Sequence, residues 1–285
     1  MFQYAFGKML ALKNGALLKL DTTLLRDRSP LETHVYREYD LDIFDTEQAF
    51  ASKQEVEYFN GMPGGSVFQR ASFKLLKLVK PRNLVVQNGH AFIKDHLFLP
   101  DNTCLAGRWQ SSFYFKDAEE KVRKDFSIKT SLLNNSEINS AILRASSAVA
   151  IHVRRGDYIS NELYKKNIGA LDLSYYKNAV SYLNSKIQDA ECFVFSDDIE
   201  WCESNLGFLP RVNFVRSERS KKGMANDLHS ISSCKHHIIS NSTFSWWGAY
   251  LSKVQNKIVI APKKWALNQG YAPPYIIPDS WKIIE

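Results

Sequence analysis

Cysteine is scarce in this sequence, and several strings that identify common enzyme classes are missing. The four cysteines, Cys104, Cys192, Cys202 and Cys234, stand apart without a C-x-x-C pair. This spacing argues against a zinc ribbon or a disulfide framework and predicts a reducing compartment. There is also no G-x-x-x-x-G-K-[ST], no H-E-x-x-H and no G-x-S-x-G string. Walker-type NTPases, zinc hydrolases and α/β-hydrolase esterases are therefore disfavoured.

Long hydrophobic runs are absent as well. The best candidate, 141–153, is broken by Arg144 and by polar residues up to His152, whereas a membrane-spanning helix needs about 18 apolar residues. The first residues do not follow the pattern of a secretion signal, because Lys8 interrupts the apolar run and no small-residue cleavage site follows. The sequence therefore predicts a cytoplasmic location.

Positive charge exceeds negative charge only moderately. Lysine and arginine number 37 against 30 aspartates and glutamates, for a net charge of +7. The excess is spread over both halves, without the basic tail or stripe that follows a nucleic-acid backbone. We therefore expect no nucleic-acid partner. A basic protein can favour anionic small molecules or the inner face of a membrane, so peripheral membrane contact is a hypothesis.

The length and the pattern of apolar runs predict two domains. At about 150 residues per domain, we place the boundary near 145 and divide the chain into 1–145 and 146–285. In the second half, apolar β-rich runs alternate with helical patterns, which indicates βαβ units and a parallel sheet. The expected strands are 148–153, 192–196, 212–215, 237–240 and 257–261, and the expected helices are 173–187, 198–206, 224–233 and 243–253.

The first half is less regular. We expect a helix at 2–14, a strand at 17–20 and a loop at 50–65. Helical patterns recur near 66–79, 117–126 and 134–145. This half alone does not suggest a particular architecture.

The string His152-Val153-Arg154-Arg155-Gly156-Asp157-Tyr158 follows an expected buried strand. Two charged side chains at the end of such a strand need partners, and the planar guanidinium group binds phosphate oxygens in pairs. One interpretation is a diphosphate-binding turn, in which Gly156 lets the backbone approach the ligand closely. The other is an Arg–Asp ion pair that fixes the turn. The pattern alone leaves both open.

Two further strings follow expected strands. Asn241-Ser242-Thr243-Phe244-Ser245-Trp246-Trp247-Gly248 combines small hydroxyl residues with a helix start, a combination that suits an anion or a plain helix cap. Upstream of it, Asn226-Asp227-Leu228-His229-Ser230 is expected to open a helix. Phe195-Ser196-Asp197-Asp198 reads as a strand end followed by a helix cap.

Asp40-Leu41-Asp42 is a D-x-D string, of the kind that holds a metal ion bridging a nucleotide diphosphate in some sugar transferases. A lone D-x-D string is a weak signal, and this one lies in the irregular half. It supports an alternative in which the chain is a metal-dependent GT-A transferase.

Taken together, these strings resemble the α-1,2-fucosyltransferases of glycosyltransferase family 11, from Met1-Phe2-Gln3-Tyr4 to the Ala-Pro-Lys-Lys-Trp near 261–265. The resemblance implies a GT-B-like α/β fold with two Rossmann-like domains and parallel sheets. The domain at 1–145 would face the acceptor, and that at 146–285 would bind a GDP-sugar. Relatives usually carry a short strand and a glycine-rich loop before this Met, which are missing here.

The same resemblance implies a reaction. L-Fucose would pass from GDP-fucose to the 2-hydroxyl of a galactoside, with inversion and without a metal ion or other cofactor. The acceptor would be a galactose-terminated glycan, lipid-linked or free, of a bacterial surface polysaccharide. An inactive GDP-sugar-binding protein remains an alternative because of the missing start.

The resemblance also assigns roles to individual residues. Arg154 matches the arginine that holds the donor β-phosphate, with Arg155 in support. His152 and Asp227 match positions at the guanine end. The hydroxyl residues Ser242, Thr243 and Ser245 match the helix start near the diphosphate. The candidates for a catalytic base are Asp157 and Glu162, which follow the arginines.

Overall fold

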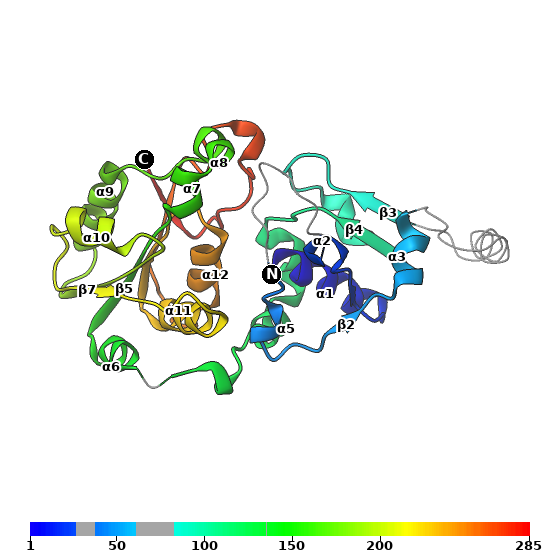
Figure 1. Cartoon of the computed structure of the whole chain (residues 1–285), viewed down its shortest axis with the longest axis horizontal. Coiled ribbons are helices and arrows are strands. Elements are labelled where there is room, and N and C mark those ends of the chain that lie inside the picture. The colour runs from blue at the N-terminus through cyan, green and yellow to red at the C-terminus, as the bar shows by residue number, and fades with distance from the viewer. Residues whose placement is uncertain (27–37, 61–82, 135) are drawn as a thin grey trace. The chain divides into compact units, whose positions relative to one another are not determined.

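The computed structural model describes residues 1–26, 38–60, 83–134 and 136–285 (Figure 1). The chain forms two compact units. Unit 1 comprises Met1–Asp42, Thr46–Asp125 and Pro273–Ile276, and unit 2 comprises Ile43–Asp45, Phe126–Ala272 and Ile277–Glu285. The boundary expected near 145 therefore falls inside unit 2. The helical pattern near 66–79 lies outside the described residues.

Unit 2 is built on a six-stranded sheet in the order β10-β9-β8-β5-β6-β7, with every neighbouring pair parallel. The strands are β5 (Ser147–Val153), β6 (Ala190–Ser196), β7 (Val212–Val215), β8 (His236–Ile238), β9 (Val259–Pro262) and β10 (Lys282–Ile284). The chain leaves β5 toward β6 and β7 and then returns to the other side of β5 through β8. This is the strand order of doubly wound nucleotide-binding sheets.

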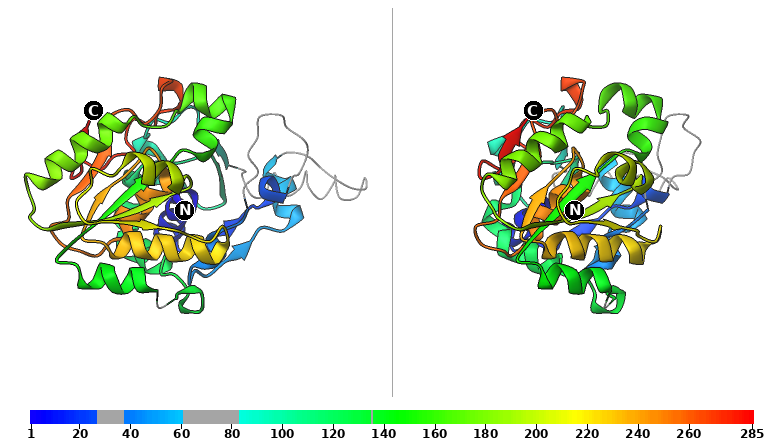
Figure 2. Two further views of the ribbon diagram at one scale, coloured as in Figure 1. Left: turned by 60° about the vertical axis from the view of Figure 1, so that its left-hand side comes forward. Right: turned by 90° about the vertical axis from the view of Figure 1, so that its left-hand side faces the viewer.

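Helices cover both faces of this sheet (Figure 2). The helices of unit 2 are α6 (Glu137–Arg144), α7 (Gly156–Ser160), α8 (Glu162–Asn167), α9 (Leu173–Asn184), α10 (Ile199–Asn205), α11 (Lys221–Ser233) and α12 (Thr243–Leu251), with short 3-10 turns η4 (Thr130–Leu132) and η5 (Gln269–Tyr271). Side chains of β5 alternate between the faces. Val149 and Ile151 pack with α9 and α10, whereas Ala148 and Ala150 pack with α6 and α11.

Unit 1 begins with α1 (Phe2–Asn14), which ends at Gly15 in the left-handed conformation at φ 61°. Its strands form two parallel pairs, β1 (Lys19–Leu20) with β2 (Ala49–Phe50) and β3 (Asn83–Val86) with β4 (Thr103–Ala106). The other elements are α2 (Thr23–Arg26), η1 (Leu41–Ile43), α3 (Lys53–Asn60), η2 (Lys94–Phe98), η3 (Ser112–Ala118) and α5 (Glu119–Asp125).

The core of unit 1 is aromatic. The ring of Phe6 on α1 lies 5.0 Å from that of Trp109 and 4.6 Å from that of Tyr114, measured between centroids. All three side chains are almost fully buried. At the edge of this core the Tyr4 hydroxyl donates a hydrogen bond of 2.8 Å to the buried Asp125 carboxylate. These contacts join the first helix to η3 and α5.

The predicted α/β class with parallel sheets is confirmed, because every pairing between the named strands is parallel. The loop expected at 50–65 is wrong for its described part, because α3 occupies 53–60. Ser52 and Glu55 exchange hydrogen bonds at its start, which is a capping box.

Each cysteine carries a free thiol. Cys192, Cys202 and Cys234 are buried in unit 2, whereas Cys104 on β4 is partly exposed. Among the described helices, none has the length and apolar character needed to cross a bilayer.

Candidate functional site

The motif residues of unit 2 gather where β5, β6 and β8 end. Arg154 directly follows β5, Asp197 follows β6, and Ser240 follows β8 by two residues. These three strands are neighbours, and the chain reverses its direction across the sheet between β5 and β8. In open α/β sheets, ligands bind outside the carboxyl ends of the strands at such a reversal. This edge of the sheet is therefore the candidate site.

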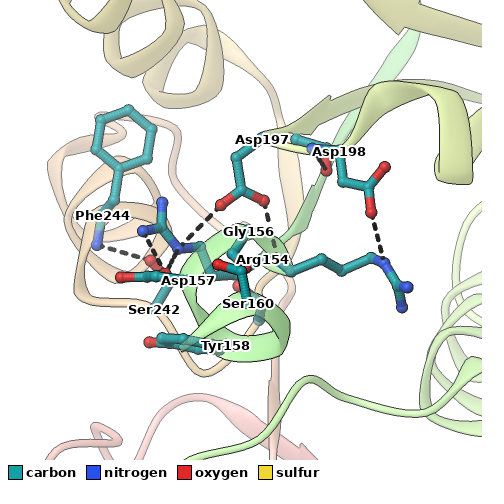
Figure 3. Close-up of polar contacts among 12 residues, drawn as sticks. Arg154, Gly156, Asp157, Tyr158, Ser160, Asp197, Asp198, Ser242 and Phe244 are labelled. Carbon is teal, nitrogen blue, oxygen red and sulfur yellow. Dashed lines mark hydrogen bonds and ion pairs between the residues drawn. The ribbon is translucent and has the colours of Figure 1, made fainter. Parts of the chain in front are cut away.

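Arg154 is held by two carboxylates (Figure 3). Its Nε and Nη2 atoms lie 3.0 and 2.7 Å from Oδ1 of Asp157. Its Nε also lies 3.1 Å from Oδ2 of Asp197. Burial acts to lower the pKa of Arg154, but Asp197 and Asp157 outweigh it and raise the pKa. The guanidinium group is therefore a fixed positive charge at the strand ends, and Nη1 makes no bond to a described residue.

Asp197 links two parts of the motif. Its Oδ1 accepts a 2.9 Å hydrogen bond from the backbone N–H of Arg155, while Oδ2 faces Arg154. A Cβ atom on Gly156 would lie 2.5 Å from that same Oδ2. The glycine therefore permits the close approach between α7 and the end of β6. The sequence assigned Asp197 only to a helix cap, a role that Asp198 fills by accepting the Trp201 N–H at 3.3 Å.

Arg155 has its own pair of partners. Its Nε lies 2.9 Å from Oδ2 of Asp198. Its guanidinium carbon lies 3.9 Å from the centre of the Trp201 ring, a cation–π contact. In Figure 3 the Asp197 carboxylate points toward Arg154, whereas that of Asp198 points away from it. The two neighbouring arginines are thus held by different carboxylates.

His152 is the residue before the last in β5. It is almost fully buried, and its Nδ1 lies 2.9 Å from Oγ of Ser240. Burial, and then the charge of Arg154, lower its pKa to about 3, so the imidazole is neutral at neutral pH. The segment after β8 is also bonded to α7, because the Tyr158 hydroxyl donates a 3.0 Å hydrogen bond to the Asn241 carbonyl.

The hydroxyl-rich string forms the start of α12, as expected. Ser242 is the N-cap and accepts a 3.3 Å hydrogen bond from the Phe244 N–H, and Thr243 is the first helical residue. Ser245 is fully buried and turns inward, donating to the Ser242 carbonyl at 3.0 Å. The N-terminus of a helix carries partial positive charge and favours anions. Of the three hydroxyls, that of Ser245 is committed to the protein backbone.

Asp227 lies in the middle of α11, which begins after the N-cap Ser220, rather than at a helix start near 224. Its carboxylate accepts a hydrogen bond from the Ser217 hydroxyl. Burial raises its pKa from 3.8 to about 6, against a smaller lowering by Ser217. Such a carboxylate suits a ligand with N–H donors, because these would favour its charged form.

The remaining candidates belong to other parts of the chain. Glu162 begins α8, its side chain is 86% exposed, and it pairs with Lys165 at 3.5 Å. Asp40 and Asp42 belong to unit 1, and Asp42 lies in η1. Across the described ranges, no three His, Cys, Asp or Glu side chains gather closely enough to hold a metal ion.

The sequence is similar to those of known glycosyltransferases. The sequence profile described as "Glycosyl transferase family 11" matches residues 92–282. An "Alpha-1,2-colitosyltransferase" of Escherichia coli is 32% identical across 100% of this chain and 94% of its own length. The "O-antigen biosynthesis glycosyltransferase WbnK" of Escherichia coli is 29% identical across 99% of this chain and 95% of its own.

Two more distant similarities cover different shares of the chain. The "Galactoside alpha-(1,2)-fucosyltransferase 1" of Mus musculus is 27% identical across 52% of this chain and 41% of its own length. Among solved structures, NodZ alpha-1,6-fucosyltransferase soaked with GDP-fucose aligns with 91% of this chain and 89% of its own, at 13% identity and a TM-score of 0.47.

Proposed function

Because this chain belongs to glycosyltransferase family 11, we propose that it transfers L-fucose from GDP-fucose to the 2-hydroxyl of a galactoside, with inversion and without a metal ion. The observation that carries this proposal is the position of Arg154. Arg154 directly follows the central strand β5, at the topological switch point of a doubly wound sheet. Folds of this kind bind nucleotides at that point.

The diphosphate of the donor would lie between Arg154 and the start of α12. Arg154 offers a charge fixed by two carboxylates, and α12 offers backbone N–H groups and the hydroxyls of Ser242 and Thr243. Ser245 supports this start from inside, because its hydroxyl bonds to the Ser242 carbonyl. No step in this arrangement requires a metal ion to neutralise the diphosphate.

The chemical step requires stabilisation of the leaving group. As the bond between fucose and GDP breaks, negative charge grows on the β-phosphate, and a positioned cation stabilises that transition state. Removal of one such group commonly costs about 10²–10³ in rate. We assign this role to Arg154 and assign Asp157 to the orientation of Arg154, since both of its contacts with Arg154 are shorter than 3.1 Å.

The guanine end would meet Asp227 and His152. The N1–H and amino group of guanine are donors that match a carboxylate, and Asp227 is a half-buried carboxylate on α11. The neutral imidazole of His152, held by Ser240, offers one ring nitrogen to the ligand. Both residues belong to unit 2 together with Arg154.

The base that accepts the acceptor's proton is not Glu162 in this proposal, because that side chain is 86% exposed and paired with Lys165. Asp157 would act as a base only by giving up its bonds to Arg154. We therefore favour a loose transition state, in which departure of GDP precedes most of the proton transfer.

The acceptor we propose is a galactose-terminated glycan of a bacterial surface polysaccharide, assembled in the cytoplasm and at the inner face of the membrane. Support comes from the WbnK relative, whose name places it in O-antigen biosynthesis. A colitosyl donor should be compared directly with GDP-fucose, because the 32% identical relative is named a colitosyltransferase. Colitose is a deoxy analogue of fucose, so a site that bonds the missing hydroxyl would distinguish the two donors.

The test is transfer of labelled fucose from GDP-fucose to lactose in the presence of EDTA, with the colitosyl donor in parallel. Product in EDTA supports the proposal, and inhibition that Mg²⁺ reverses would favour a metal-dependent enzyme that uses Asp40 and Asp42. GDP binding without transfer to any galactoside would favour an inactive binding protein. A faster reaction with the colitosyl donor would mean that the sugar transferred is colitose rather than fucose, while the proposed reaction type would stay the same.

A further inference from the structure

The two adjacent arginines, Arg154 and Arg155, have different bonding partners. Arg154 is bonded to Asp157 and Asp197. Arg155 is bonded to Asp198 and stacked on the ring of Trp201 at 3.9 Å, and its side chain is only 19% exposed. A guanidinium held by a carboxylate and by an aromatic face would lose both contacts by turning toward a phosphate. Arg155 is therefore better suited to anchoring than to binding the donor.

Both partners of Arg155 come from the first turn of α10. Asp198 is the N-cap, and one of its oxygens accepts the Trp201 N–H at 3.3 Å while the other faces Arg155 at 2.9 Å. The Asp198 N–H donates in turn to the Ser196 hydroxyl at 3.0 Å. The carboxylate of Asp198 and the indole ring of Trp201 thus hold the Arg155 guanidinium from two sides, and both are anchored at the end of β6.

The backbone of Arg155 is tied to the same segment. Its N–H donates to Asp197 at 2.9 Å, and the other oxygen of Asp197 faces Arg154. The residue is the N-cap of α7, so its position determines where the turn from β5 into α7 runs. Fixing the side chain and the N–H of Arg155 therefore fixes the residue before it.

We propose that Trp201 is a positioning residue for sugar transfer, which holds Arg155 on α10 and thereby orients Arg154 toward the diphosphate. This inference rests on the proposed function. It gives the two arginines separate roles, with Arg154 as the phosphate ligand and Arg155 as its anchor. Trp201 need not touch the donor in order to act.

The test is a double-mutant cycle on GDP affinity, measured by calorimetry with the full chain. Trp201→Leu is expected to weaken GDP binding at least about fivefold, within the range seen for coupled residues. In the Arg154→Ala background the same substitution is expected to change the affinity by less than about twofold, because no arginine remains to be oriented. Trp201→Phe keeps an aromatic face and is expected to retain most of the affinity.

Tyr182→Leu is the matched control. Tyr182 lies on α9 in unit 2 and makes its own cation–π contact, with Lys282 at 5.2 Å. We expect this variant to bind GDP as the unaltered chain does. Thermal unfolding of each variant would show that the affinities belong to folded protein.

Three outcomes would overturn the inference. Equal losses from Trp201→Leu with and without Arg154 would mean a general structural role. A further loss on adding Arg155→Gln to a variant that already carries Trp201→Leu and Asp198→Ser, and so lacks both anchoring contacts, would mean that Arg155 itself contacts the ligand. An unaltered chain that binds no GDP would overturn this inference and the proposed function together. GDP binding with the expected coupling but without transfer to a galactoside would overturn only the proposed function.

Discussion

The Nδ1 atom of His152 lies 2.9 Å from the hydroxyl oxygen of Ser240, and both side chains are buried. The contact joins the last residues of β5 to the segment that follows β8. Since the pKa of His152 is lowered to about 3, the imidazole is neutral and has one donor and one acceptor nitrogen. Because a serine hydroxyl can either donate or accept, the Ser240 contact suits both tautomers, and what it fixes is the orientation of the ring.

Replacing Ser240 by alanine should destabilise the chain. The change leaves a buried ring nitrogen without its partner, which costs about 1–3 kcal/mol. Urea unfolding followed by circular dichroism would measure the loss, and GDP affinity should fall with it. Ser185→Ala is the control, because this serine is exposed just after α9. An unchanged unfolding midpoint for Ser240→Ala would contradict the role given to this pair.

Arg154→Ala should remove transfer while the fold stays intact. The loss of a positioned cation at the leaving group is expected to lower kcat by about 10²–10³. Steady-state kinetics with GDP-fucose would measure it, and circular dichroism would confirm the fold. Arg216→Ala is the comparison, because that arginine pairs with Glu203 on the surface of unit 2. Transfer within about tenfold of the unaltered chain would be too fast for the assigned role.

Gly156→Ala should disturb the same arginine indirectly. The added methyl group would lie 2.5 Å from the Asp197 oxygen that faces Arg154, so this carboxylate must move. Displacement of a catalytic group by about 1 Å can cost about 10²-fold in rate. Gly207→Ala is the matched control, since nothing lies within 4 Å of its added carbon. Equal kinetics for both variants would show that the close approach is unimportant.

Asp227 should make the stability of the folded chain depend on pH. Burial raises its pKa from 3.8 to about 6 in the folded chain, so between these values the folded state binds more protons than the unfolded state. Its contribution to stability is therefore largest below about pH 4 and is lost as the pH rises to about 6. Asp227→Asn should remove this loss, which chemical unfolding on both sides of the window would detect.

The same group should link GDP binding to pH. If guanine donors contact Asp227, binding favours the carboxylate, so the affinity should fall as the pH drops below about 6 and binding should release protons. Calorimetry in buffers of different ionisation enthalpy would measure that release. Asp189→Asn, at an exposed carboxylate paired with Arg211, should leave it unchanged. No proton release by the unaltered chain near pH 6 would argue against a contact between guanine and Asp227.

The sequence predicts the second half of the chain well for a physical reason. Its buried parallel strands are continuous apolar runs, so β5, β6 and β7 begin and end close to the expected residues. The short strand β10 was not expected, because three residues carry too little pattern. The helix α3 was also missed, although its Ser52 and Glu55 form a capping box that the sequence displays.

For the candidate site, the sequence placed the motif strings at strand ends that the structure also has, but it did not identify the partners of Arg155. Arginines directly after a buried run are visible in one dimension, and so is the hydroxyl-rich start of α12. The stacking of Arg155 on Trp201 is not visible, because it depends on β5 and β6 being neighbours. The two interpretations of Arg154 and Asp157 are also compatible, since an arginine that pairs with Asp157 can still present a nitrogen to a phosphate.

The distribution of thiols makes the chain convenient for site-directed labelling. Cys104 is partly exposed on β4 of unit 1, whereas the three cysteines of unit 2 are buried. Burial raises the pKa of Cys104, so maleimide dyes should react slowly at neutral pH and faster in mild alkali. Burial also raises the pKa of Cys192 to about 12 and that of Cys202 to about 11. A fluorophore would therefore attach to unit 1 without any engineered substitution and report on that unit during donor binding.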